Sequence, residues 1–353
     1  MFRLLSRNFL PADRAMRILF IGGTGNISGA ITRQLAARRD CELVLLNRGN
    51  RMAEVPDGVR VVKADIKDES DVAHKLEGLE FDSVCDFIGF RPEQMERDFR
   101  LFGGRTGQFI YISSASAYDK SSGGVITENT PLGNPYWEYS RDKIACEEVL
   151  MRHYREDAFP VTIVRPSHTY GELKIPVSVH GTRGAWQVVR RMIEGKPVIV
   201  HGDGESLWTL TFNEDFAQGF IGLICNPGAI GEAYHITSDE ALSWNRIYRT
   251  IAESLGVEFK PYYVPSDLLA SLAPAEFEME GNLLGDKAPS AVFDCTKLKR
   301  AVPDFSPQIP FREGCRRSLN YFLSHPELQV EDPEFDKWCD DVIARGDCNI
   351  RLH

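Results

Sequence analysis

A glycine-rich turn near the start of the chain constrains its fold more than any other feature. The run Gly22-Gly23-Thr24-Gly25-Asn26-Ile27-Ser28-Gly29 follows an apolar stretch at 17–21 and precedes a helical pattern at 27–38. Glycines between a strand and a helix let backbone N–H groups approach a pyrophosphate, whose charge the helix N-terminus favours. Ser28 stands where a third glycine is usual, but serine is small enough for the turn to form. The residues expected to bind a dinucleotide are Gly22, Thr24, Gly25, Asn26 and Ile27.

The first half of the chain alternates short apolar or β-branched stretches with stretches of helical periodicity. Strands are expected at 17–21, 42–46, 59–62, 83–87, 108–112 and 161–164. Helices are expected at 27–38, 70–76, 92–101 and 137–153. Strands that alternate with helices in this way build a parallel sheet covered on both faces. The pattern therefore predicts an α/β fold with a doubly wound parallel sheet.

After Tyr170 this alternation gives way to stretches punctuated by proline and glycine, with helical patterns at 184–193 and 243–255. At about 150 residues per domain, the length of 353 residues predicts two domains. The expected parts are an N-terminal extension at 1–15, a cofactor domain at 16–170, a substrate-binding region at 171–326 that partly returns to the cofactor domain near 209–240, and an acidic tail at 327–353.

The charge of the chain is negative and uneven. Acidic side chains number 51 and basic ones 41, a net charge of −10, and half of that excess lies in 327–353. A negative protein repels phosphate backbones unless a basic patch overrides its charge, so nucleic acid is not the expected partner. No apolar run reaches the ~18–20 residues that span a bilayer, so no membrane partner is expected.

Eight cysteines are scattered along the chain without a C-x-x-C pair. A chain of this length builds its own hydrophobic core, so the cysteines are expected to be reduced thiols of a cytoplasmic protein. No cluster of histidine, cysteine and carboxylate residues has the spacing of metal ligands, and no metal is expected.

The end of the second expected strand indicates which dinucleotide fits. An acidic residue there binds the adenosine ribose of NAD, whereas this chain has Asn47 and Arg48 at that place. The guanidinium of Arg48 can pair with a 2′-phosphate, so NADP is favoured over NAD. Asp65 and Ile66 follow the third strand, and in such a fold they are expected near the adenine.

Tyr139 is followed four residues later by Lys143, at the start of the helix expected at 137–153. This spacing places both side chains on one helical face. A lysine ammonium favours phenolate over phenol, so Lys143 is expected to lower the pKa of Tyr139 and to make it usable in proton transfer. Ser114 lies at the end of the strand expected at 108–112, where its hydroxyl can hold a substrate alcohol or ketone.

Together the glycine turn, Ser114, the Tyr139–Lys143 pair and the segment 165–171 resemble the extended or atypical short-chain dehydrogenases/reductases, the NAD(P)-dependent epimerase/dehydratase family. The resemblance covers about 16–240 and implies a Rossmann-type fold. It implies that Tyr139 is the general acid/base, that Lys143 also binds the nicotinamide ribose and that Ser114 orients the substrate. It further implies a homodimer formed through two helices of the cofactor domain. It places near the nicotinamide Pro166 and Ser167.

Two departures from the family pattern bear on the substrate. Ala115 and Ser116 stand where sugar-nucleotide 4,6-dehydratases carry an Asp-Glu pair, so dehydration by that route is disfavoured. Trp208 stands where an arginine that binds a nucleotide diphosphate is expected. Arg183, Arg190 and Arg191 are nearby in sequence and can supply the missing charge. A carbohydrate-like substrate is expected, and a nucleotide diphosphate on it is left open.

His168 follows the last expected strand of the cofactor domain and allows two interpretations. Its imidazole can assist proton transfer or bind substrate, or it can be a structural histidine bonded to a loop carbonyl. The candidate substrate residues are Ser116, His168, Arg183 and Trp208.

The main hypothesis is an enzyme that moves a hydride between nicotinamide and an alcohol or ketone carbon of a sugar-like substrate. Return of the hydride to the same substrate gives epimerisation, and otherwise the enzyme is a dehydrogenase or reductase; the sequence leaves both open. The alternative is an atypical member without turnover, which resembles chloroplast stem-loop RNA-binding proteins or senses its cofactor. The negative charge and the complete set of Ser114, Tyr139 and Lys143 oppose it.

Overall fold

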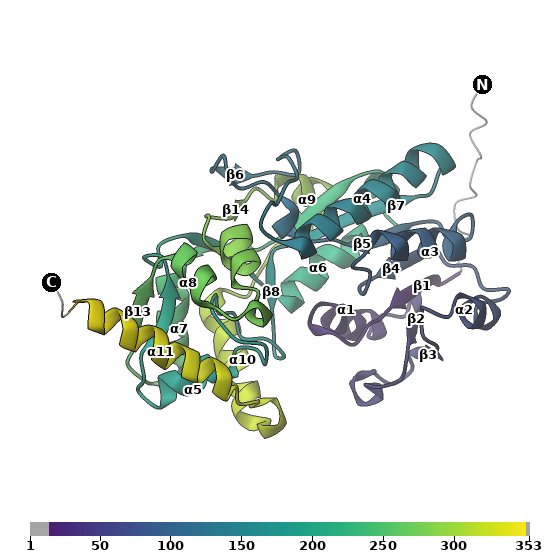
Figure 1. Ribbon diagram of the computed structural model, residues 1–353. Helices are drawn as coiled ribbons and strands as arrows, with labels where there is room; N and C mark the ends of the chain where they lie inside the picture. The colour runs from purple at the N-terminus through teal and green to yellow at the C-terminus, as the bar shows by residue number, and fades with distance from the viewer. Residues whose placement is uncertain (1–13, 351–353) are drawn as a thin grey trace.

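The computed structural model describes residues 14–350, and side chains of residues 14–346. Two lobes lie side by side (Figure 1). One is built on a seven-stranded sheet, and the other consists of small sheets and helices from the second half of the chain. Of the expected extension at 1–15, only Arg14 and Ala15 fall within the described residues.

All neighbouring strands of the large sheet are parallel, in the order β11-β7-β5-β4-β1-β2-β3. The chain order reverses between β1 and β4, so the sheet is doubly wound and the predicted fold class is confirmed. The strands are β1 (Met16–Ile21), β2 (Cys41–Asn47), β3 (Arg60–Lys63), β4 (Ser83–Asp86), β5 (Phe109–Ile112), β7 (Val161–Pro166) and β11 (Ala233–Ile236).

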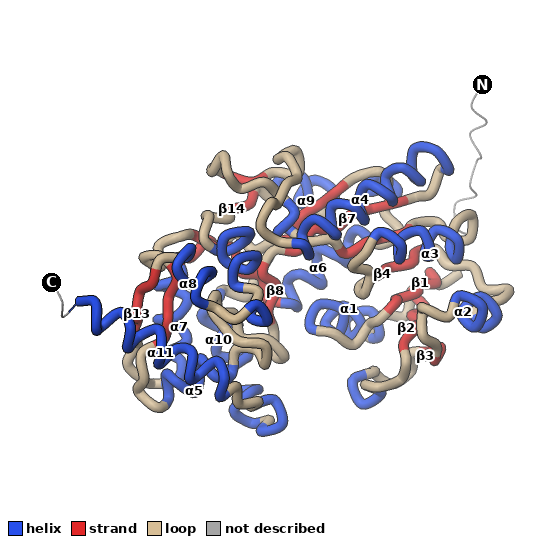
Figure 2. Tube along the Cα trace, in the orientation of Figure 1, coloured by secondary structure: helices blue, strands red, loops and turns tan. Residues whose placement is uncertain are grey.

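Alternation along β1 explains why both faces of this sheet are covered. Ile18 and Phe20 pack into a core beneath one helical layer, while Leu19 and Ile21 pack into a second core on the opposite face. The first layer consists of α1 (Asn26–Ala36) and α6 (Asn213–Leu223). The second layer consists of α2 (Glu69–Lys75), α3 (Pro92–Phe102) and α4 (Glu138–Asp157). The layers are visible in Figure 2 as helices on either side of the red strands.

The second half of the chain returns to the large sheet after leaving it. Strand β11 pairs with β7, and α6 packs on α1 and β11. Helix α9 (Thr296–Ala301) packs on β11 as well. The cofactor lobe therefore contains residues from both halves of the chain.

The smaller lobe has its own hydrophobic core, centred on Trp208, Trp244 and Tyr248. Its strands are β8 (His168–Tyr170), β9 (Val198–His201), β10 (Leu207–Phe212), β12 (Ala241–Ser243), β13 (Pro261–Val264), and the pair β6 (Val125–Ile126) and β14 (Val292–Phe293). Its helices are α5 (Trp186–Ile193), α7 (Trp244–Leu255), α8 (Ser266–Leu272), α10 (Phe311–Ser324), α11 (Pro333–Ile350) and the π-helix η5 (Glu280–Lys287). Five 3₁₀ turns complete the described chain: η1 (Met52–Glu54), η2 (Ala115–Ala117), η3 (Pro227–Ala229), η4 (Ala275–Phe277) and η6 (Pro326–Leu328).

The acidic residues at 327–353 do more than form a charged tail. Helix α11 buries Phe335, Trp338 and Cys339 in the core of the smaller lobe. On its other side, Asp336 and Asp340 accept hydrogen bonds from the buried guanidinium of Arg191 at 2.6 and 2.8 Å. Much of the negative charge in this segment therefore serves to dock α11 on α5.

Most expected elements of the cofactor domain lie within two residues of the observed ones. Helix α4 extends four residues beyond the expected end and stops where Ala158 adopts a left-handed conformation, with φ of 55°. None of the described helices combines the length and apolar character needed to cross a membrane.

Candidate functional site

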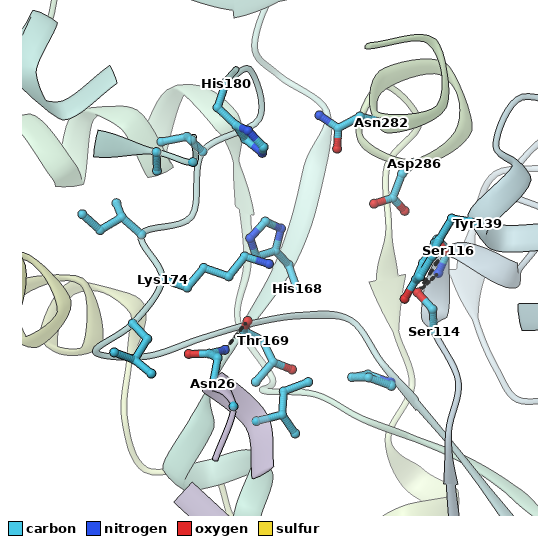
Figure 3. Close-up of a pocket in the computed structure, with 18 of the residues that line it drawn as sticks. Asn26, Ser114, Ser116, Tyr139, His168, Thr169, Lys174, His180, Asn282 and Asp286 are labelled. Atoms are coloured by element: carbon cyan, nitrogen blue, oxygen red, sulfur yellow. Dashed lines mark hydrogen bonds between the residues drawn. The ribbon is translucent and has the colours of Figure 1, made fainter. Parts of the chain in front are cut away.

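A cavity of about 790 Å³ lies between the two lobes, at the carboxyl ends of β1, β4, β5 and β7. Binding sites of doubly wound sheets lie at this edge, outside the reversal of strand order. The cofactor lobe contributes the glycine turn, the residues after β5 and the start of α4. The smaller lobe contributes polar side chains that Figure 3 shows around the cavity: His168, Lys174, His180, Asn282 and Asp286.

The glycine turn has the shape that a dinucleotide pyrophosphate requires. Gly22 and Gly23 have φ of +107° and +103°, and a Cβ on Gly23 would lie 2.6 Å from Leu45 Cδ2. The N-terminus of α1 follows at the cavity wall, with no acidic residue in its first turn. These features fit an NAD(P) pyrophosphate.

Tyr139 lies in the first turn of α4 and lines the cavity beside the turn that follows β5. Figure 3 shows it next to Ser114 and Ser116. The hydroxyl oxygens of these two serines are 2.9 Å apart, and Ser140 donates to Ser116 Oγ at 2.7 Å. Ser114 hydrogen-bonds to Tyr139, so the predicted serine–tyrosine pair is brought together.

Lys143 lies one helical turn after Tyr139 and is buried beneath it. Its ammonium donates to the carbonyl oxygens of Gly89 and Ile112, both at 2.7 Å. It also lies 4.6 Å from the Phe90 ring centroid and 5.8 Å from that of Tyr139. The lysine is therefore fixed by backbone carbonyls at the ends of β4 and β5, close to Tyr139 and at the cavity wall.

The protonation equilibria of this pair differ from the expected ones. Burial raises the pKa of Tyr139, and the hydrogen bond to Ser114 only partly opposes that rise. Burial lowers the pKa of Lys143 to about 8, although the nearby charge of Asp86 opposes this. The expected lowering of the Tyr139 pKa by Lys143 is therefore wrong for this protein without cofactor: desolvation of the phenolate outweighs the lysine.

His168 lies at the start of β8, with its ring edge-on to Trp208 and Trp244. Its buried Nε2 has no hydrogen-bond partner among the described residues, so this nitrogen is not bonded to a loop carbonyl. Burial and then the charge of Lys174 lower its pKa well below the ordinary value. The ring is therefore a neutral group at the substrate end of the cavity.

Two lysines that the sequence did not mark as site residues reach the same region. Lys287, at the end of η5, is buried and donates to Asn282 Oδ1, and burial lowers its pKa to about 8. Lys174 extends beside His168 in Figure 3. Lys174 follows Tyr170 by four residues, the same spacing that separates Tyr139 from Lys143. Tyr170, however, lies in the hydrophobic core of the smaller lobe. Spacing along the chain identifies a catalytic pair only where both residues share a helix.

Trp208 is buried, and its Nε1 donates to the Lys287 carbonyl oxygen at 3.3 Å. Arg183 also lines the cavity and donates to the Glu331 carbonyl oxygen at 3.2 Å. Arg191, on α5, donates a hydrogen bond to Asp336 of α11 instead. Of the predicted substrate residues, the cavity therefore brings together Ser116, His168, Arg183 and Trp208.

The predicted cofactor residues divide into three groups. Those that line the cavity are Gly25, Asn26, Ile27, Tyr139, Lys143, Pro166 and Ser167. Thr24 lines a neighbouring pocket of about 180 Å³. Outside both lie Gly22, Asn47, Arg48, Asp65 and Ile66. Asn47 and Asp65 shape the turns after β2 and β3 by accepting from the N–H groups of Gly49 at 2.9 Å and Lys67 at 3.0 Å.

Comparisons with known proteins show the family to which this chain is related. A sequence model of the NAD dependent epimerase/dehydratase family matches residues 18–237. The chain is 28% identical to 2'-dehydrokanamycin reductase of Streptomyces kanamyceticus, over 84% of this chain and 81% of that protein. It is 23% identical to chloroplast stem-loop binding protein of 41 kDa b of Arabidopsis thaliana, over 95% and 86% of the two chains. The matches to several other relatives cover 52%, 61% and 48% of those proteins' lengths.

Solved structures show the same architecture. The crystal structure of UDP-glucuronic acid 4-epimerase from Bacillus cereus, in complex with UDP-glucuronic acid and NAD, superposes with a TM-score of 0.70 at 19% identity. The match covers 88% of this chain and 99% of that one.

Proposed function

Because this chain belongs to the NAD-dependent epimerase/dehydratase family, we propose that it is an NAD(P)-dependent oxidoreductase or epimerase with Tyr139 as its general acid/base. The substrate is an alcohol or ketone carbon of a sugar or a sugar-nucleotide-like molecule. The observation that carries the proposal is the convergence of Ser114, Tyr139 and Lys143 on one cavity that the glycine turn also lines.

The roles of the three residues follow from their chemistry. The bound cofactor accepts or supplies a hydride at the reacting carbon. Tyr139 exchanges a proton with the oxygen on that carbon, since its hydroxyl lies at the cavity wall. The Ser114 hydroxyl, which already hydrogen-bonds to Tyr139, orients the same substrate oxygen. Lys143 is held within one helical turn of Tyr139, where it binds the cofactor ribose and stabilises the phenolate when this forms.

A net reductase or an epimerase fits the residues after β5 better than a 4,6-dehydratase. Ala115 and Ser116 carry no carboxylate, and the hydroxyl of Ser116 is engaged by Ser114 and Ser140. Elimination of water needs groups that move protons at two positions of the sugar, and neither residue can do this at neutral pH. That one relative is named a reductase supports the same preference.

The cofactor is NADP in preference to NAD. Arg48 is exposed at the carboxyl end of β2, without a carboxylate beside it in sequence. A guanidinium at this position favours a 2′-phosphate over a bare ribose. NAD is the cofactor named for the Bacillus cereus epimerase. The preference for NADP therefore rests on Arg48, in the loop after β2 of this chain.

We further propose a cytoplasmic homodimer formed through α3 and α4. The seven cysteines whose side chains are described are all free, as in a reducing compartment. Helices α3 and α4 pack side by side on one face of the sheet, and their outer surfaces offer a two-helix interface. Sedimentation analysis tests this, and a monomer at all concentrations contradicts it.

The experiment that tests the function starts from the purified protein. Mass spectrometry of the denatured supernatant identifies a copurifying nucleotide, and fluorescence titration compares NADPH with NADH. Turnover is then assayed with UDP-glucuronic acid and UDP-glucose, and by reduction of keto-sugars with NADPH. If the protein binds neither NADPH nor NADH, the proposal is overturned. Salt-sensitive binding of stem-loop RNA at physiological ionic strength, without dinucleotide binding, supports the non-catalytic alternative instead.

A further inference from the structure

A carboxylate from a distant part of the chain lies beside the proposed general acid/base. Asp286, in the π-helix η5, lines the same cavity as Tyr139. Figure 3 shows it next to Tyr139 and Ser116, on the wall opposite His168 and Lys174. Its charge reaches the phenol and raises the pKa of Tyr139, after the larger effect of burial.

The π-helix is built to come close to the start of α4. A Cβ on Gly281 would lie 2.3 Å from Cδ1 of the Trp137 ring, so only glycine permits this approach. Trp137 directly precedes α4, and its ring lies 5.0 Å from that of Tyr139. Widened helical turns of this kind occur mainly at functional sites. The backbone that carries Asp286 is therefore packed against the residues that carry Tyr139.

One buried side chain fixes this arrangement. Asn134 Nδ2 donates to the Gly285 carbonyl oxygen at 2.7 Å and to that of Ser116 at 2.9 Å. Its Oδ1 accepts from the backbone N–H groups of Tyr136 at 3.2 Å and Trp137 at 3.1 Å. The residue before Asp286, the serine turn and the start of α4 are thus tied to a single amide.

Asp286 forms an ion pair through one of its two oxygens. Lys120 donates to Asp286 Oδ1 at 2.5 Å, and both side chains are almost fully buried. No described residue donates a hydrogen bond to Asp286 Oδ2, and Asp286 lines the cavity. A negative charge therefore stands at the cavity wall beside Tyr139.

Above about pH 8, the other titratable groups around Tyr139 do not cancel this charge. Lys143 lies below the ring, but burial lowers its pKa to about 8, so it loses its charge above that pH. Cys146 on α4 and Tyr111 on β5 are neutral at neutral pH, because burial raises the pKa of each. Lys120 opposes Asp286 but lies on the far side of the carboxylate, bonded to Oδ1. The groups facing the phenol disfavour its ionisation.

We propose that Asp286 is a positioning residue that disfavours the Tyr139 phenolate and so widens the pH range in which the neutral phenol donates a proton to a ketone oxygen. The inference rests on the proposed function and adds the direction of the reaction, which is reduction of a ketone. The ketone gains the phenolic proton at oxygen and a hydride at carbon and is reduced to the alcohol, while the reduced nicotinamide is oxidised. Tyr139 is left as a phenolate, which regains a proton from solvent. The substrate class is therefore a keto-sugar.

The test observes the Tyr139 phenol directly. The protein is labelled with tyrosine carrying ¹³C at Cζ, the Tyr139 resonance is assigned with Tyr139→Phe, and spectra are recorded with and without NADPH from neutral pH upward. In the wild type, Tyr139 is expected to remain a phenol beyond pH 10. Asp286→Asn is expected to bring phenolate formation down by about one pH unit. Asp286→Glu, which keeps the charge, should restore the wild-type titration.

Glu278→Gln is the matched control. Glu278 lines the same cavity and lies eight residues before Asp286, but its charge is not among those that affect the pKa of Tyr139. A folded Asp286→Asn protein with a wild-type Tyr139 titration overturns the inference, as does a wild-type phenolate at neutral pH. Keto-sugar reduction by NADPH is measured alongside, and its alkaline limb should move to lower pH in Asp286→Asn. Loss of turnover in every variant would count against the proposed function. The titration of the Tyr139 ¹³C resonance would still test the role of Asp286, because it does not depend on turnover.

Discussion

Asn134 Nδ2 donates a hydrogen bond of 2.9 Å to the carbonyl oxygen of Ser116. The bond crosses from the loop before α4 to the turn after β5, so it links the two segments that carry Tyr139 and Ser114. The same amide also binds Gly285, which brings the smaller lobe into the connection. The relative positions of Ser114 and Tyr139 therefore depend on a buried amide outside the Ser114–Tyr139–Lys143 set.

Replacing Asn134 with leucine is expected to destabilise the fold by about 2–4 kcal/mol, because buried carbonyl and N–H groups lose their partner. Denaturant unfolding measures this change. Turnover should fall more than NADPH affinity, because Ser114 and Tyr139 lose their alignment while the glycine turn is untouched. Asn320→Leu, on the exposed face of α10, is the control. Equal stability of both variants would show that the Asn134 hydrogen bonds are replaceable.

His201 makes the stability of the smaller lobe depend on pH. It is 2% exposed and hydrogen-bonded to Ser178 Oγ at 2.9 Å and to the Lys287 carbonyl oxygen at 3.1 Å. Burial lowers its pKa to about 4, below the ordinary value of 6.5. Its contribution is therefore complete above pH 6.5 and is lost as the pH falls towards 4, since the unfolded state then binds the proton more tightly.

The expected loss from His201 over that range is on the order of 3 kcal/mol. His201→Gln should flatten the curve of unfolding free energy between pH 4 and 6.5. His74→Gln, at an exposed position on α2, should leave the curve as in the wild type. Parallel curves for wild type and His201→Gln would assign the acid sensitivity to other groups.

Arg48 is expected to select the cofactor. Arg48→Ala should weaken NADPH binding by about tenfold, because a charged hydrogen bond to the 2′-phosphate is lost, and leave NADH binding nearly unchanged. Fluorescence titration at constant ionic strength measures both. Arg39→Ala removes an exposed positive charge after α1 and controls for general electrostatics. A uniform loss for the two dinucleotides would mean that Arg48 does not contact the 2′-phosphate.

Local patterns were sufficient for the cofactor lobe. The glycine turn and the alternation of strands and helices predicted the sheet, because these signals lie between neighbours in sequence. Tyr139 and Lys143 were found because one helical turn separates them. The same logic could not find Asp286, since it meets Tyr139 only through the packing of the π-helix η5 on Trp137.

Other differences have equally specific causes. The acidic segment after 327 was expected as a tail because its charges are evident, whereas its apolar Phe335 and Trp338 become informative only beside α5. The pKa of Tyr139 was expected to fall because the sequence shows Lys143 but not burial. Lys174 and Lys287 were missed because neither the loop after β8 nor the π-helix η5 has a recognisable sequence pattern.

The central claim is that Tyr139 transfers the proton in a reaction that uses NAD(P)H. The most direct measurement is the single-turnover rate of NADPH oxidation with a keto-sugar substrate, in Tyr139→Phe and in Tyr136→Phe, whose ring is 48% exposed outside the cavity. Tyr139→Phe is expected to bind NADPH like the wild type and to lose about 10²–10⁴-fold in rate, while Tyr136→Phe keeps it. A wild-type rate in Tyr139→Phe would contradict the account.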